Sequence, residues 1–407
     1  MASCESWTLE SSELQAEIHP GCLLSSIPFQ DEDIVKGEKG SKMTLIKASQ
    51  QPQTPKKEKV LLTGGTGFVA SHVLDSLTTN GHPVVVTVRS EEKGNRLLQS
   101  LSHFSASNQV QYAIVPDIST KNAFDPILHD HCFTYVIHTA SPYQLSFADP
   151  VNDCLNPAIK GTTYLLDSIH RLCPSVTRVV ITSSSAAILN PPNHRDVYDE
   201  SSWSDVSWEQ AMQPEHTYRA SKKFAEQAAW SFLEEHNPRF TIATINNTYT
   251  FGPLSRSLAN SAKFSSAEVN TSNRRIWDLI HGKWRNPDGS ACIPSTAPVF
   301  TFVDVRDVAD AHLAALTAPG QRYYIVGGFF SNYQIARIVD EEFKGVLGDD
   351  VLPDLKGQED DFEEEKHWKF DVSRSEKELG IRYRGLRESV RDAVVSMLEF
   401  EKGTTFN

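Results

Sequence analysis

A glycine-rich turn between an apolar run and a helical segment constrains the fold of this chain more than any other feature. The apolar residues 60–62 lead into Thr63-Gly64-Gly65-Thr66-Gly67, and apolar residues then recur at helical spacing. Strand, glycine turn and helix in this order form the phosphate-binding corner of a dinucleotide fold. Gly64 permits the tight turn, Gly67 permits close approach of a pyrophosphate, and the small Ala70 lets the helix pack on its strand. The alternative is an ordinary tight turn, because the spacing is G-x-x-G-x-x-A rather than G-x-G-x-x-G.

The second predicted strand, residues 83–88, indicates which dinucleotide is bound. Enzymes that use NAD usually place an acid near the end of this strand to hold the ribose hydroxyls. Here that place is taken by Val88, and Arg89 and Lys93 follow. A guanidinium and an ammonium suit the 2′-phosphate of NADP through charge-assisted hydrogen bonds. We therefore predict NADP(H) as the cofactor, with a basic surface turn as the alternative.

The rest of the chain alternates predicted strands with helices. Further strands are expected at residues 108–115, 133–138, 178–182 and 240–245. This alternation predicts an α/β fold, a Rossmann-type doubly wound parallel sheet with helices on both faces. The rhythm is lost at 252–298 and from 328 onward, where we expect a smaller C-terminal substrate lobe. The predicted organisation is an N-terminal arm at 1–58, expected to be flexible, and an NADP-binding domain at 59–401 whose lobe is mainly 252–298 and 328–401.

Composition excludes several classes of partner. A net charge of -13 over 407 residues argues against general binding of nucleic acid or of an anionic membrane. No apolar run approaches the roughly 20 residues that span a bilayer, and the acidic start of the chain fits neither a signal nor a transit peptide. The six cysteines lack metal-ligand spacing, so no metal site is predicted. We expect a cytoplasmic protein; the sequence does not predict its oligomeric state.

A tyrosine and a lysine four residues apart carry the predicted chemistry. In Tyr218-Arg219-Ala220-Ser221-Lys222 the phenol and the ammonium lie on one face of a predicted helix. A nearby ammonium favours the phenolate and lowers the pKa of the tyrosine, which suits proton exchange with a carbonyl or alcohol. The predicted strand at 178–182 ends in hydroxyl side chains, and Ser184 there could hold the substrate oxygen. Each feature alone is also typical of an exposed helix or a polar strand end; the combination is more specific.

At this point the sequence resembles a known family, the extended short-chain dehydrogenases/reductases. Within it, the chain is similar to dihydroflavonol reductases, cinnamoyl-CoA reductases and fungal methylglyoxal or aldehyde reductases. The resemblance spans about residues 59–400 and rests on the motifs at 63–68, 136–142, 179–184, 199–205, 218–222 with 224–230, 251–253 and 302–309. It implies reduction of an aldehyde or ketone to an alcohol by hydride transfer from NADPH, with a small-molecule carbonyl compound as the partner.

The resemblance also implies site residues. The family's catalytic serine, tyrosine and lysine fall on Ser184, Tyr218 and Lys222, although Ser183 and Ser185 leave the serine open by one place. The implied cofactor contacts are Gly64, Thr66, Gly67, Phe68, Val69, Arg89, Lys93, Asp117, Ile118, Thr139, Ala140, Ser141, Tyr218, Lys222 and Thr248. The expected lining of the substrate pocket is Tyr143, Phe147, Thr248, Tyr249 and the segment 252–298.

Two departures from the family pattern affect these expectations. Ala158 stands where the wider family often has Asn in Asn-x-x-Gly, so a relay role of that Asn is in doubt. Asn247 stands where the family usually has Pro, beside the expected nicotinamide position. Two other kinds of function stay open. One is a sugar-nucleotide epimerase/dehydratase or a hydroxysteroid dehydrogenase of the same fold. The other is a non-catalytic NADP-sensing regulator, against which the Tyr/Lys pair argues.

Overall fold

The computed structural model describes residues 57–101, 109–141, 148–259, 269–348 and 350–402, all of which belong to one compact unit. The predicted arm at 1–58 lies almost wholly outside these residues, as do Tyr143 and Phe147 of the predicted pocket lining. Within the described residues no helix is long and apolar enough to cross a membrane.

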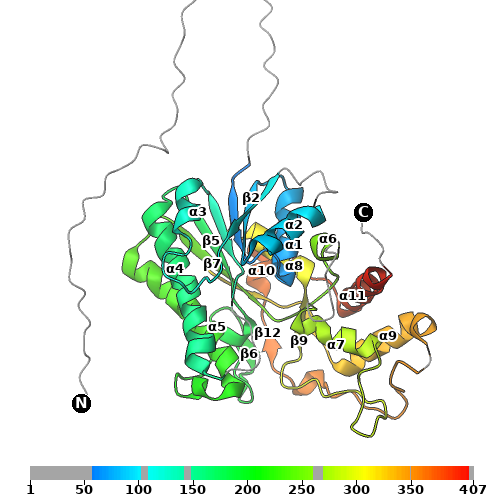
Figure 1. Ribbon diagram of the computed structural model, residues 1–407. Coiled ribbons are helices and arrows are strands. Elements are labelled where there is room, and N and C mark those ends of the chain that lie inside the picture. The colour runs from blue at the N-terminus through cyan, green and yellow to red at the C-terminus, as the bar shows by residue number, and fades with distance from the viewer. Residues whose placement is uncertain (1–56, 102–108, 142–147, 260–268, 349, 403–407) are drawn as a thin grey trace, which may run out of the picture. The chain divides into compact units, whose positions relative to one another are not determined.

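A seven-stranded parallel sheet forms the centre of the unit, in the order β3-β2-β1-β4-β5-β7-β10 (Figure 1). The chain starts in the middle at β1, runs outward through β2 and β3, and then returns to β4 on the other side of β1. This reversal leaves a crevice at the carboxyl ends of β1 and β4, where open α/β sheets bind ligands. The strands are β1 (Val60–Thr63), β2 (Val84–Val88), β3 (Val110–Ile114), β4 (Tyr135–His138), β5 (Arg178–Thr182), β7 (Thr241–Asn247) and β10 (Arg322–Ile325).

Helices cover both faces of the sheet because successive strand residues point to opposite sides. Val60 and Leu62 pack with one set of helices, whereas Leu61 packs with the other; all three are fully buried. The first set is α1 (Phe68–Thr79), α2 (Glu91–Leu101) and α8 (Val305–Ala314). The second set is α3 (Asp125–Asp130), α4 (Asn156–Leu172) and α5 (Pro214–His236). The predicted doubly wound parallel sheet is therefore confirmed.

A second hydrophobic core lies beside the sheet and is built from later parts of the chain. A three-stranded sheet in the order β11-β9-β8 packs there with three helices, which Figure 1 shows on the side of the molecule away from α4. Its elements are β8 (Tyr249–Phe251), β9 (Thr301–Asp304), β11 (Gly328–Phe329), α7 (Thr271–Ile280), α9 (Asn332–Leu347) and α11 (Leu386–Glu401). A short parallel pair, β6 (Val197–Tyr198) and β12 (Lys369–Phe370), and the short helices α6 (Arg256–Ala259) and α10 (Ser373–Glu378) complete the described elements.

Candidate active site

The glycine turn joins β1 to α1 and brings the backbone against the end of β4. Gly64 has a φ of +70°, and a Cβ built on it would lie 2.9 Å from the Ala140 Cα. Both the backbone angle and the space therefore require glycine at this position. Gly67 is exposed at the start of α1, a helix with no side-chain cap and no acidic residue in its first turn. The N-terminal N–H groups of α1 consequently suit a phosphate.

The end of β2 carries the predicted determinant for NADP. Val88 is buried, whereas Arg89 directly after the strand is exposed. Lys93 is half-buried in the first turns of α2, and its N–H donates to Ser90 Oγ at 3.4 Å. Asp117, after β3, has a lowered pKa, chiefly because Ser119 donates to its carboxylate, with a contribution from the charge of Arg89. Arg89 and Asp117, both predicted as cofactor contacts, are thus close enough to interact electrostatically.

Thr139, Ala140 and Ser141 follow β4 and link the glycine turn to the catalytic helix. The Ala140 N–H donates to Thr63 Oγ1 at 3.1 Å, and the Thr139 hydroxyl donates to the Thr63 carbonyl at 2.5 Å. The Lys222 ammonium donates to Ser141 Oγ at 3.0 Å. Hydrogen bonds therefore connect the carboxyl ends of β1 and β4 to α5.

Tyr218 and Lys222 lie one turn apart near the start of α5, as their spacing predicts. The Lys222 Nζ is 5.8 Å from the centre of the Tyr218 ring. Burial lowers the pKa of Lys222 to about 8. This ammonium is still charged at neutral pH, and its charge favours the phenolate form of a neighbouring tyrosine.

Of the three serines after β5, Ser184 suits a substrate oxygen best. Ser183 and Ser185 are buried, and the Ser183 hydroxyl donates to Glu226 Oε2 at 2.5 Å. Ser184 is half-buried and begins a 3-10 turn, Ser185–Ala187, in which the Ala186 N–H donates to Ser184 Oγ at 3.1 Å. The helix α5 packs directly on this turn, so the elements that carry Ser184 and Tyr218 are in contact.

A buried network beneath the serine turn escaped the sequence analysis. Glu226, one turn after Lys222, accepts hydrogen bonds from Ser183, from Asn246 Nδ2 at 2.6 Å and from Arg322 Nε at 2.6 Å. Arg322 also donates to backbone carbonyls of residues 200 and 202. The network fixes the position of the serine turn against β7 and β10. The sequence feature that could have indicated the network is the acid at 226, which lies on the same helical face as Tyr218 and Lys222.

The segment after β7 holds Asn247 and Thr248. The Thr248 hydroxyl is bonded to Thr301, with the two hydroxyl oxygens 2.7 Å apart, so a cofactor contact of Thr248 would involve its backbone. Asn247 Nδ2 donates to Thr250 Oγ1 at 2.9 Å, so the side chain of Asn247 bonds within the segment that joins β7 to β8. The Asn247 Oδ1 is buried and has no hydrogen-bond partner.

The helix α4 provides a close packing contact but no relay side chain. Ala158 is buried, and a Cβ on Gly161 would lie 2.7 Å from the Ile118 Cδ1, so glycine permits the contact between α4 and Ile118, a predicted cofactor contact. One turn before Ala158, the buried Cys154 lies in a π-helical turn, Val151–Leu155, and interacts electrostatically with Lys222. Burial raises the pKa of this thiol, which keeps it neutral.

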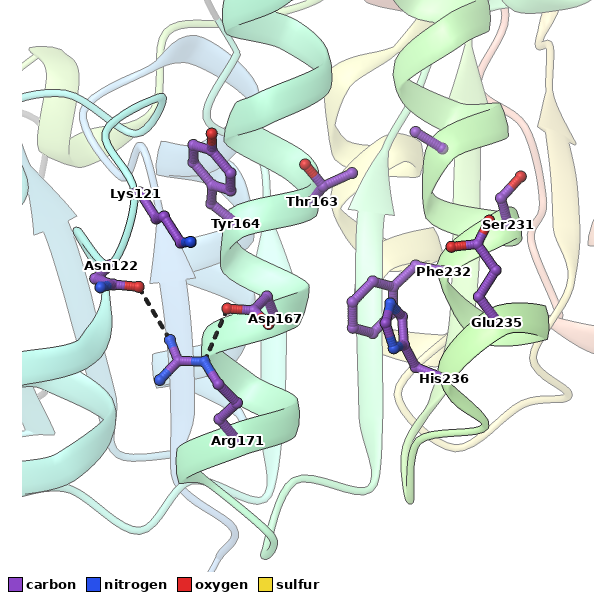
Figure 2. A pocket seen from close by; sticks show the side chains of 11 residues that line it. Lys121, Asn122, Thr163, Tyr164, Asp167, Arg171, Ser231, Phe232, Glu235 and His236 are labelled. Atoms are coloured by element: carbon purple, nitrogen blue, oxygen red, sulfur yellow. Dashed lines mark hydrogen bonds and ion pairs between the residues drawn. The ribbon is translucent and has the colours of Figure 1, made fainter. Parts of the chain in front are cut away.

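A hollow of about 790 Å³ between α4 and the C-terminal part of α5 contains none of the predicted site residues (Figure 2). Arg171 in its wall donates to Asp167 at 2.8 Å and to Asp125 at 2.9 Å. Tyr164 and His236 lie on opposite walls in Figure 2. Because Arg171 and Asp167 are already paired with each other and no predicted site residue lines the hollow, we assign no ligand to it. Among the described residues, no cluster of three or more His, Cys, Asp or Glu side chains is arranged to hold a metal ion.

Comparisons with known proteins identify the family. Residues 60–327 match the family model described as the NAD dependent epimerase/dehydratase family. The chain belongs to this family. It is 46% identical over 350 residues to the ketoreductase azaE of Aspergillus niger, an alignment that covers 84% of this chain and 98% of that protein.

Two further likenesses concern a yeast reductase. The chain is 33% identical to the NADPH-dependent methylglyoxal reductase GRE2 of Saccharomyces cerevisiae over 354 residues, which cover 84% of this chain and 98% of that protein. The crystal structure of yeast methylglyoxal/isovaleraldehyde reductase Gre2 complexed with NADPH superposes with a TM-score of 0.73 at 32% identity and covers 85% of this chain and 99% of the other. The resemblance to extended reductases that the motifs indicate is thereby confirmed.

Proposed function

We infer that the chain is an NADP(H)-dependent oxidoreductase that reduces an aldehyde or ketone to an alcohol, and we propose Tyr218 as its general acid. The observation that carries the catalytic assignment is the joint placement of Lys222 beside Tyr218 and Ser141 at the carboxyl edge of the sheet. The reductases that share a third to nearly half of its sequence over almost their whole length support the reaction type.

The residues at the sheet edge fit the cofactor. The start of α1 and the close contact of Gly64 with Ala140 suit a pyrophosphate, and Arg89 suits the 2′-phosphate because no acid stands at Val88. Bound NADPH supplies the hydride that reaches the carbonyl carbon. Lys222 would hold the nicotinamide ribose by a hydrogen bond. Its bond to Ser141 does not prevent this, because an ammonium has three donors.

The proton must reach the carbonyl oxygen, and the chain's own groups deliver it. Ser184 would hold that oxygen by a hydrogen bond while the Tyr218 hydroxyl donates its proton to it. The positive charge of Lys222 stabilises the phenolate that remains. His138 at the end of β4 does not supply a proton, since burial and the charge of Lys222 lower its pKa to about 3.

Two rival functions are less well supported. An epimerase shares the fold and the Tyr/Lys pair, but the relatives at 33–46% identity named above are reductases, and Val88 replaces the acid expected of NAD users. A non-catalytic NADP sensor would not need the Tyr/Lys pair. Binding of NADPH without turnover across a panel of aldehydes, ketones and 2-oxo compounds would favour the sensor.

The test is Tyr218→Phe, which removes only the hydroxyl. We expect turnover to fall by about 10²–10⁴, the usual contribution of a general acid, while NADPH binding, followed by fluorescence, stays unchanged. Tyr164→Phe on α4 is the matched control and should leave turnover unchanged. Ser184→Ala should lower turnover alone, and Lys222→Ala should lower both turnover and NADPH affinity. Near-normal turnover of Tyr218→Phe would exclude the assignment.

A further inference from the structure

Arg275 on α7 is a partly buried cation in an aromatic environment and has no acidic partner in the described part of the chain. Its guanidinium carbon lies 4.6 Å from the ring centre of Tyr249, 4.9 Å from that of Phe330 and 6.0 Å from that of Phe251. Its Nη1 donates to Asn332 Oδ1 at 2.9 Å, and the Tyr249 hydroxyl also interacts with the guanidinium. Its Nε is buried without a hydrogen-bond partner. Arg275 forms no ion pair with any described residue.

Two other arginines withdrawn from water are neutralised by carboxylates, whereas Arg178 and Arg219 donate to backbone carbonyls. Arg322 pairs with Glu226 at 2.6 Å, and Arg306 pairs with Asp304 at 2.8 Å and Asp392 at 2.7 Å. Withdrawing a cation from water without an anion is costly. Burial accordingly lowers the pKa of Arg275, and the more distant Asp361 offsets this only in part. The electrostatic environment of Arg275 would be completed by an anion.

The position of Arg275 connects it to the candidate active site. Tyr249, on which it stacks, comes two residues after the end of β7 and begins β8. The end of β7 contacts the serine turn, since Asn246 Nδ2 donates to the Ser184 carbonyl at 3.4 Å. The start of α7 is held on the same strand, because the Thr250 N–H donates to Ser272 Oγ at 3.1 Å. Arg275 therefore lies on the elements that continue from the serine turn into the second core.

The geometry of the guanidinium indicates what kind of anion fits. Asn332 accepts a hydrogen bond from Nη1, whereas Nε has no partner. Because Nε is buried, the side chains that cover it must move for an anion to bind the edge that Nε forms with Nη2. This edge presents two parallel N–H groups, the arrangement that binds a carboxylate through two hydrogen bonds. The half-buried ring of Tyr249 would pack on the carbon chain that carries the carboxylate, whereas Phe330 is fully buried and packs only on protein.

We propose that Arg275 binds the carboxylate of an oxo-acid substrate, so that the enzyme reduces the carbonyl group of molecules that carry an acid at their far end. This inference rests on the proposed function, because it takes Tyr218 and Ser184 as the groups that face the carbonyl. One hydride from NADPH and one proton from Tyr218 convert the oxo acid to the hydroxy acid, and the carboxylate stays unchanged. The aromatic rings and Asn332 hold the guanidinium in place before the substrate arrives.

The test compares oxo acids with their methyl esters on the full chain, with NADPH oxidation as the readout. The panel pairs 2-, 4-, 5- and 6-oxo acids with esters of equal length, on wild type, Arg275→Gln and Arg337→Gln. Arg337 is exposed on α9 and is the matched control. For at least one chain length the wild type should prefer the acid. Arg275→Gln should then lower kcat/KM for that acid by about 10- to 100-fold, mainly through KM, and change the ester by less than about two-fold.

Two results would overturn the inference. One is a wild type that prefers the ester at every chain length. The other is an Arg275→Gln variant that loses activity on acid and ester alike, since that pattern indicates a structural role. Failure of the proposed function is distinguishable, because then neither acid nor ester is reduced. In that case calorimetric titration of the hydroxy acids into the complex with NADP⁺ decides: loss of binding in Arg275→Gln supports the acid site, and unchanged binding refutes it.

Discussion

Lys222 and Arg275 are both cations withdrawn from water, but they are placed in different ways. Lys222 lies one helical turn from Tyr218 and bonds to Ser141, so its environment comes from α5, from the end of β4 and from the turn that carries Cys154. Arg275 receives its environment from α7, β8 and residues around β11 and α9. In the function proposed above, Lys222 would serve chemistry that every substrate shares, whereas Arg275 would distinguish one substrate from another. On this proposal, reaction and selectivity are built on separate cores of the molecule.

The largest expected effect is on stability. It tests whether replacing a buried arginine that has an ion-pair partner costs more free energy of unfolding than replacing one that has none. Arg322→Met leaves Glu226 buried beneath the serine turn without its cationic partner. Removing one member of a buried ion pair costs about 3–5 kcal/mol, so the free energy of unfolding should fall by that amount in urea titration. Arg337→Met, on an exposed face of α9, should change it by less than about 0.5 kcal/mol. Equal stability of both variants would contradict the role given to the network.

The next effect concerns the cofactor at the sheet edge. Arg89→Ala should weaken binding of NADPH by about 1.5–3 kcal/mol, because one charge-assisted contact with the 2′-phosphate is lost. Binding of NADH, which lacks this phosphate, should be unchanged, and Arg239→Ala in an exposed loop should affect neither. Fluorescence titration with both cofactors measures the difference. An equal loss for NADPH and NADH would mean that Arg89 does not recognise the phosphate.

A smaller effect follows from the lowered pKa of Lys222. Its folded-state pKa of about 8 lies below the ordinary value of 10.5, so folding disfavours the charged form. The resulting destabilisation is fully present below pH 8 and is relieved as the pH rises from about 8 to 10.5. Lys222→Met should therefore stabilise the cofactor-free protein by about 1–2 kcal/mol at pH 7, a value reduced for partial exposure.

The same experiment at higher pH provides the check. The advantage of Lys222→Met over wild type should shrink toward pH 10 in thermal unfolding, whereas Lys160→Met, on an exposed part of α4, should show no such trend. A stability difference that does not change with pH would show that burial of charge at Lys222 is not its cause.

The smallest expected effect is the change in stability when Arg275, rather than Arg322, is replaced. Because Arg275 has no acidic partner to strand, Arg275→Met should stay within about 1 kcal/mol of wild-type stability. Denaturant titration of the cofactor-free chain, beside Arg322→Met, measures this contrast. A loss as large as that of Arg322→Met would show that Arg275 stabilises the fold, and its role as a substrate group would lose its basis.

The sequence predicted the parts of the molecule that depend on local pattern. The strand at 178–182 was predicted with the bounds of β5, and the helix predicted to carry Tyr218 and Lys222 is α5, because periodicity and turn residues act over a few positions. The glycine turn could be predicted from the sequence, because a φ of +70° at Gly64 requires glycine. The proximity of Tyr218 and Lys222 could also be predicted, because residues four positions apart lie one helical turn apart.

The remaining parts depend on contacts between distant segments. The strand β8 has only three residues and pairs with β9, about fifty positions later, so no local pattern predicts it. Asp361, in the acidic run at 358–365, accepts hydrogen bonds from Thr296 and Ser295, which precede it by 65 and 66 positions. The hydroxyl of Thr248, a residue predicted to contact the cofactor, bonds to Thr301, which lies 53 positions later. The environment of Arg275 was likewise beyond sequence reasoning, because its aromatic neighbours come from 249–251 and 330.

The most direct test of whether reaction and selectivity are separate measures kcat/KM for the preferred oxo acid and for its methyl ester. The ratio of the two values is compared among the wild type, Tyr218→Phe and Arg275→Gln. Tyr218→Phe should lower kcat/KM for the preferred oxo acid and for its methyl ester by the same factor, so the ratio stays at the wild-type value. Arg275→Gln should lower the ratio by about 10- to 100-fold while kcat for the ester is kept. A ratio that changes with Tyr218→Phe, or does not change with Arg275→Gln, would contradict the account.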